Sequence, residues 1–268
     1  QHSNRNNNNT MQNYCKTIGA LATATALAAG NASALGYEDI DAEIHVGYDN
    51  RYLFRGIELG DDLVHAGLDV GTSVAGLDIS AGAWYGSWNA NNAGPTVDAD
   101  ELDIYAEVSK DLGFASLAVG YIYYTFPQGD TLTNPNFVQD AQEVYLSASR
   151  EIFGVDASIA YFWDIETDND GYTQLSLSKG FEIMPYVTLN TGTDFGYLAE
   201  EGDLVHITAK VGIDIEASEN ATISYYVAHS WSTSEGGTLA GGAGGVSTAL
   251  YGGAENEFFF GGSVAVSF

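Results

Sequence analysis

The C-terminal segment Glu257–Phe268 reads EFFFGGSVAVSF, and its side chains alternate between two kinds. The intervening positions are small or polar, apart from Phe259. A period of two predicts a β-strand with one apolar face. The large apolar side chains share that face and comprise Phe258, Phe260, Val264, Val266 and Phe268.

The same alternation recurs along the chain from Asp41 onward. Most of these segments are longer than the about 5–6 residues usual for a strand. They reach the about 9–11 residues that a tilted strand needs to cross a membrane. Twelve segments show the pattern: 42–55, 62–74, 77–88, 100–112, 115–126, 139–153, 155–166, 170–182, 185–198, 203–216, 220–231 and 255–268.

The connections between these segments alternate between short and long. AG after Val74 and FG after Ile152 are short, whereas IELGDD at 57–62 and the glycine-rich run near 232–254 are counted as long. Short turns on one rim and long loops on the other are typical of outer-membrane barrels. We therefore predict an all-β fold, a membrane-spanning antiparallel up-and-down β-barrel of about twelve strands. A soluble sandwich is the alternative, but the small polar face is as continuous as the apolar one.

The first 34 residues have the features of an export signal. Lys16 is followed by the apolar run TIGALATATALAAG, and Ala32-Ser33-Ala34 resembles a cleavage site. We expect a cleaved leader at 1–34 and a barrel at 35–268, with Gln1 or Met11 as the start. Cys15, the one cysteine, precedes the apolar run, so no disulfide is expected in the exported part.

The charge of the chain restricts its partners. The formal net charge is −28, and removal of Arg5 and Lys16 with the leader changes it to −30. Nucleic-acid binding needs a basic patch, so nucleic acid is not expected as a partner. We expect outer-membrane lipid and lipopolysaccharide around the barrel, small solutes within it, and loose divalent cations at acidic loops. No cofactor and no specific metal site are predicted.

The few basic residues fall into two groups by strand parity. Lys110, Arg150 and Lys179 share a face with apolar residues near the periplasmic ends of their strands. Their stems can lie along the barrel while the charges reach the head groups, so we predict interface anchors.

The second group of basic residues is predicted to point into the lumen. In DNRYLFRG (49–56), alternation directs Tyr52 and Phe54 towards lipid. Charged rows facing each other across a narrow pore set its selectivity. The alternative is that the arginines only brace the wall by satisfying inward acids. The expected pore-lining residues are Arg51, Arg55, Lys210 and His45 with Asp49, Asp69, Glu107, Glu143 and Asp214.

Two motifs suggest chemistry only weakly. ETDNDG at 166–171 begins like a calcium loop, but Leu177 stands where the bidentate glutamate is needed. A hydrolase reading depends on His65 with Asp61 or Asp62, and on a second pair, His206 with Asp203. A histidine poised by a carboxylate is suited to acid–base catalysis, but this spacing is unspecific, and no catalytic residue is assigned.

Two segments resemble known outer-membrane proteins. The alternating row that ends at Phe268 is similar to the C-terminal signature read by the barrel assembly machinery, which implies an assembly signal. The block Tyr52-x-Phe54-Arg55-Gly56, followed by Gly82, Trp84 and Gly86, resembles the start of the TorF-type porins. That resemblance covers about residues 44–88 and implies an outer-membrane barrel of about twelve strands, without a substrate or catalytic residues.

The sequence thus predicts a bacterial outer-membrane, porin-like channel for passive diffusion of small hydrophilic solutes or ions. A non-conducting structural or surface-interaction barrel is the second interpretation, and an outer-membrane hydrolase with rim Asp/His residues is the third.

Overall fold

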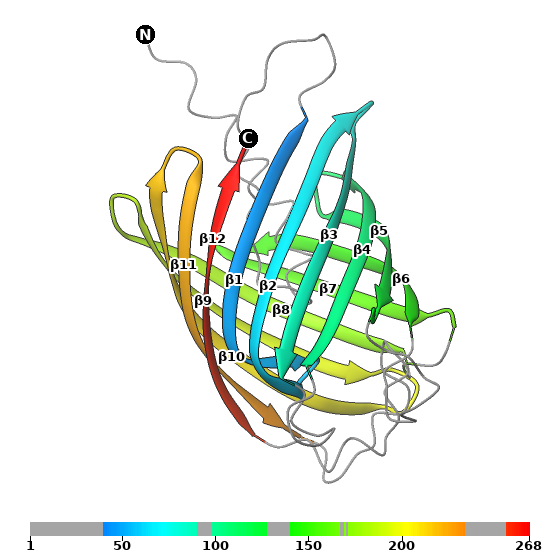
Figure 1. Cartoon of the computed structure of the whole chain (residues 1–268). Helices are drawn as coiled ribbons and strands as arrows, with labels where there is room; N and C mark the ends of the chain where they lie inside the picture. The colour runs from blue at the N-terminus through cyan, green and yellow to red at the C-terminus, as the bar shows by residue number, and fades with distance from the viewer. Residues whose placement is uncertain (1–39, 90–97, 128–139, 167–168, 170, 234–255) are drawn as a thin grey trace, which may run out of the picture.

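Twelve antiparallel strands close into one barrel in the computed structural model (Figure 1). The structure describes residues 40–89, 98–127, 140–166, 169, 171–233 and 256–268, so the predicted leader lies outside the described residues. The fold class predicted from the alternation is confirmed. The strands are β1 (Asp41–Phe54), β2 (Ile57–Val74), β3 (Leu77–Asn89), β4 (Asp98–Asp111), β5 (Ser116–Thr125), β6 (Ala141–Ile152), β7 (Val155–Asp164), β8 (Tyr172–Met184), β9 (Val187–Leu198), β10 (Asp203–Ser218), β11 (Ala221–Ser232) and β12 (Glu257–Ser267).

The barrel closes where β1 pairs with β12. At one end of this seam the N–H of Phe268 donates to the carbonyl of Ala42 at 2.8 Å. We call this end the terminal rim and the opposite end the loop rim. Each strand pairs with its neighbours in chain order, as expected for an up-and-down barrel.

Charged side chains face the inside of the barrel and large apolar side chains face outwards. In β1, Ile44 and Val46 are 47% and 51% exposed, whereas Glu43 and His45 are 1% and 2% exposed. This arrangement is the inverse of a soluble protein and is typical of a barrel with lipid outside and a polar lumen. Within the described residues, no helix is long and apolar enough to cross a membrane.

Three of the tight turns have the same construction. Ala75-Gly76 and Phe153-Gly154 at the terminal rim have positive φ at both residues, and so does Arg55-Gly56 at the loop rim. Two such residues form the turn that matches the twist of a hairpin. The prediction that IELGDD is a long loop is therefore wrong, because β2 begins at Ile57, directly after this turn.

The β1–β2 hairpin leaves the wall at the loop rim and turns into the lumen (Figure 1). The ladder register shifts between Tyr52 and Leu53, and again between Asp61 and Val64 where β2 pairs with β3. Such bulges bend a strand and change the direction of its side chains. Tyr52 and Phe54, predicted to face lipid, are instead buried inside the barrel, because β1 stops pairing with β12 at Asp49 and the hairpin tip beyond it is enclosed in the lumen on both faces.

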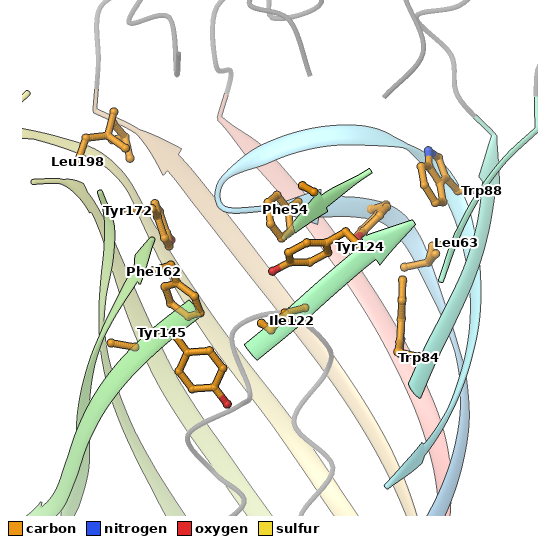
Figure 2. Close-up of a cluster of buried hydrophobic side chains, with 14 residues drawn as sticks. Phe54, Leu63, Trp84, Trp88, Ile122, Tyr124, Tyr145, Phe162, Tyr172 and Leu198 are labelled. Atoms are coloured by element: carbon orange, nitrogen blue, oxygen red, sulfur yellow. The ribbon is translucent and has the colours of Figure 1, made fainter. Parts of the chain in front are cut away.

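An aromatic cluster surrounds the hairpin tip within the lumen. Figure 2 shows Phe54 beside Tyr124 of β5, with Trp84 and Trp88 of β3 on one side of it. Phe162 and Tyr172 extend the cluster towards β7 and β8. An eight-stranded barrel is filled by wall side chains alone, but twelve strands enclose more space. Here the side chains of the hairpin tip fill part of that additional space.

Candidate functional site

The centre of the candidate site is an ion pair between the hairpin tip and the opposite wall. The Arg55 guanidinium donates two hydrogen bonds to Glu143 of β6, at 2.8 Å and 2.7 Å. Glu143 is 0% exposed and also accepts from Tyr124 Oη at 3.0 Å and Asn169 Nδ2 at 2.8 Å. A bidentate pair fixes direction as well as distance. We call this arrangement the Arg55–Glu143 latch.

Aromatic rings surround the cation of the latch. The guanidinium carbon lies 4.8 Å from the ring centroid of Phe162 and 4.2 Å from that of Tyr172. Its own neighbour Phe54 lies at 4.8 Å. Burial acts to lower the pKa of Arg55, which lies in the turn outside the strands, but Glu143 together with Tyr124 and Tyr172 outweighs burial and the pKa is raised. The cation therefore stays charged in its buried position.

Further contacts hold the hairpin tip to other strands. Tyr52 Oη donates to Glu101 of β4 at 2.7 Å. Arg51 donates to Glu58 within the hairpin at 2.8 Å and to Glu257 of β12. Gly56 lies against the side chain of His206 of β10, where an added Cβ would lie 2.5 Å from the His206 Cβ. The tip is thus held at points around the whole circumference.

Most of the acids predicted to line the pore are held by tyrosines. Asp49 accepts from Tyr226 Oη and Asp69 from Tyr105 Oη, both at 2.5 Å. Glu107 accepts from Tyr145 Oη at 2.8 Å. Asp214 accepts instead from Asn190 at 2.6 Å and Ser224 at 2.7 Å. The inward tyrosines therefore fix the carboxylates, a role that the sequence analysis missed.

The predicted basic side of the lumen is not one continuous row. Arg55 belongs to the latch, and Arg51 is bound by Glu58 and Glu257. Lys210 lies further from the loop rim, with Nζ 3.7 Å from the ring centroid of Tyr226. On the outer face, Lys110 and Arg150 are exposed, and Lys179 lies 5.4 Å from the ring of Phe181. Their anchoring role remains a prediction.

The buried histidines do not form the Asp/His pairs on which the hydrolase reading depends. His65 Nε2 lies 3.4 Å from Asp49 Oδ2, and Asp62 accepts from Tyr48 instead. His206 contacts Tyr172 Oη at 2.9 Å and Thr208 at 3.1 Å rather than Asp203. His45 Nε2 lies 3.6 Å from Asp69. The pairings follow the register between strands, which chain spacing does not encode.

Each of these histidine rings lies over a glycine of the neighbouring strand. An added Cβ would lie 2.1 Å from His45 at Gly67 and 2.4 Å from His65 at Gly47. Tyr145 lies over Gly120 in the same way, at 2.1 Å. Rings that cover glycines are a known device of β-sheets. The inward-facing glycines are the sequence feature from which the positions of these rings could be predicted.

A cavity lies in the lumen directly beneath the hairpin tip. It has a volume of about 130 Å³, and its wall includes Asp49, His65, Trp84, Asp194, Lys210 and Tyr226. A cavity of the order of 150 Å³ holds a six-membered ring. Among the described residues, no three His, Cys, Asp or Glu side chains gather closely enough to hold a metal ion.

Comparison with protein families gives one match over most of the chain. The model of Gcw_chp, a bacterial protein family of unknown function, matches residues 29–235. The chain belongs to the Gcw_chp family. The resemblance to TorF-type porins is not confirmed by this match, and no curated protein matches the chain.

Solved structures show a likeness of fold to the Gcw_chp chain. The COG4313 outer membrane channel from Pseudomonas putida F1 has a TM-score of 0.51 and 9% identity over 90% of this chain and 100% of that chain. A KdgM porin has a TM-score of 0.48 and 9% identity, over 85% and 99%. The Salmonella typhi outer membrane phospholipase dimer with bound calcium has a TM-score of 0.48 and 14% identity, over 90% of this chain and 94% of that chain. At these identities the likeness concerns the barrel fold alone.

Proposed function

We propose that this protein is a channel of the bacterial outer membrane that passes small hydrophilic solutes and is closed at the loop rim by its own β1–β2 hairpin. The observation that carries the proposal is the latched hairpin tip inside a twelve-stranded barrel with a polar lumen. The hairpin reaches across to Glu143 instead of completing the wall, so it narrows the lumen at this rim. We interpret it as an element that regulates passage through the barrel.

The charge of the lumen supports a preference for cations. Asp69, Glu107 and Asp214 face inwards and accept hydrogen bonds from the uncharged side chains of Tyr105, Tyr145 and Ser224. Acidic rings in a pore raise the local concentration of cations. Arg51, Arg55 and Lys210 are the basic counterparts, whose positive charges favour anions locally.

Conductance measurements in planar bilayers test the proposal. We expect small single-channel currents from the wild type and currents at least several-fold larger from the Arg55→Ala/Glu143→Ala double variant, which removes the latch without leaving an unpaired charge. A KCl gradient is expected to give a reversal potential of cation-selective sign. The matched control is Lys179→Ala/Glu182→Ala near the terminal rim of β8, which should conduct like the wild type.

A double variant that is folded but gives no current above the protein-free bilayer would contradict the channel. The non-conducting structural or surface-interaction barrel would then be favoured. Hydrolysis of lipid or peptide that persists after His65→Ala and His206→Ala would not come from the rim Asp/His residues.

The C-terminal residue provides a separate prediction about assembly. Phe268 is 54% exposed on the outer face, at the end of the apolar row of β12. We propose that the barrel assembly machinery reads this row. Phe268→Ala should lower the amount of folded barrel in the outer membrane several-fold, measured by heat-modifiable gel migration, while refolding of the purified chain into micelles is unchanged. Equal loss in both assays would indicate a stability defect instead.

A further inference from the structure

The wall of the cavity beneath the hairpin tip includes the rings of Trp84 and His65, whose nitrogens are buried. Trp84 Nε1 and both ring nitrogens of His65 make no hydrogen bond within the described residues, although the two side chains are only 3% and 2% exposed. Buried polar groups in native proteins almost always have a partner. Both side chains line the cavity, but these nitrogens are enclosed by protein atoms, so the other polar groups of the wall are the ones that a ligand can reach.

Other groups around the cavity have capacity for a ligand. The Tyr226 ring covers one side of the Lys210 ammonium, which carries three N–H donors and belongs to the cavity wall. Asp49 accepts from Tyr226, but a carboxylate accepts up to about four hydrogen bonds. Asp194 adds a second carboxylate on the β9 side. The wall therefore presents both donors and acceptors, together with the rings of Trp84 and Tyr226.

The charges restrict the class of ligand. An anion would have to enter through an acidic lumen and then lie beside Asp49 and Asp194. A cation would compete with Lys210, which already occupies the face of Tyr226 near these carboxylates. A hydroxyl group donates one hydrogen bond and accepts two, so a neutral polyol satisfies both kinds of group without adding charge.

We propose that the cavity is a binding site for a small neutral polyhydroxylated solute of about monosaccharide size. Hydroxyl oxygens accept from Lys210, hydroxyl protons are donated to Asp49 and Asp194, and the apolar face of the ring lies on an aromatic side chain. The closed hairpin forms the roof of the site, since Arg55 and Gly56 are part of its lining. The inference names the solute class of the proposed channel and rests on that proposal for its biological role.

Binding to the full barrel in detergent micelles tests the site independently of conductance. We expect glucose to bind saturably, with a dissociation constant of the order of 1 mM, measured by calorimetry and by tryptophan fluorescence. Lys210→Met keeps the length of the side chain and removes the donors, and should weaken binding about three- to tenfold, the effect of one hydrogen bond. Lys179→Met on the outer face is the matched control and should bind like the wild type.

Three further ligands separate the alternatives. Fully O-methylated glucose cannot donate hydrogen bonds and should not compete with glucose. Saturable binding of lysine or glutamate without binding of glucose would overturn the neutral class. No glucose binding up to about 100 mM in a barrel of native gel migration would show that the cavity holds water only. Conductance without binding would reject this site and leave the channel, whereas binding without conductance would do the reverse.

Discussion

The Glu143→Gln variant is expected to expose the hairpin tip that the wild-type barrel keeps buried. Glutamine has nearly the same shape as glutamate, but it leaves the Arg55 cation buried without a counter-charge. Breaking one partner of a buried ion pair costs about 3–5 kcal/mol. This loss should shift the opening equilibrium of the hairpin by at least about a hundredfold. Because the hairpin can leave the lumen, we expect local opening rather than unfolding of the barrel.

Limited digestion with trypsin measures this opening directly. Arg55 lies at the apex of the turn, so cleavage after it requires the tip to leave the aromatic cluster. The exposed Lys110, two residues before the β4–β5 connection, provides an internal standard in the same chain. Glu182→Gln, an exposed glutamate on β8, is the matched control. Equal rates of cleavage after Arg55 in Glu143→Gln and wild type would show that the ion pair does not hold the tip.

The Gly120→Ala variant is expected to lower the free energy of unfolding by about 2–4 kcal/mol. A Cβ at position 120 would lie 2.1 Å from the Tyr145 ring, so the ring must move. Overpacking of this kind costs about 1–3 kcal/mol, and weakening of the Tyr145–Glu107 hydrogen bond adds about 1 kcal/mol. Urea unfolding in micelles measures the change.

Gly192→Ala is the matched control for this prediction. It also lies on the inner face, but its added Cβ would meet nothing closer than 3.6 Å. We expect little change or a small gain, because glycine within a strand is less favourable than alanine by about 0.5–1 kcal/mol. In the Gly120→Ala/Tyr145→Ala double variant the two losses should not add, since the clash is absent. Additive losses would mean that Tyr145 does not depend on Gly120.

The barrel itself could be predicted from the sequence because its period of two is local. Alternation in segments such as 155–166 and 203–216 requires no knowledge of neighbouring strands, and both are strands in the structure. The inward direction of Arg55 was also reached in this way. The tight turn of the closed hairpin is not predicted, although Arg55-Gly56 has the same form as two turns that are predicted, Ala75-Gly76 and Phe153-Gly154.

The details of the candidate site depend on register and on bulges. His65 meets Asp49 rather than Asp61 or Asp62 because β1 and β2 pair antiparallel, with Asp49 opposite Leu63 and Gly47 opposite His65. The alternation rule assigns Tyr52 to lipid because it assumes a strand that stays in the wall, whereas β1 stops pairing with β12 at Asp49 and its tip lies in the lumen. The contact between Arg55 and Glu143 joins residues 88 positions apart and follows only from closure of the barrel.

The inward turn of the hairpin also leaves the barrel with an incomplete seam. Pairing between β1 and β12 stops at Asp49 and Gly261, while β12 continues to Glu257 along β11. Just beyond this point the Asn50 side chain accepts the N–H of Phe260 at 2.6 Å, in place of a backbone partner. The strand that obstructs the mouth is therefore the same strand that joins the two ends of the sheet. A hairpin that returned to the wall would lengthen that junction, so in the proposed channel the movement that opens the mouth would also extend the seam of the barrel.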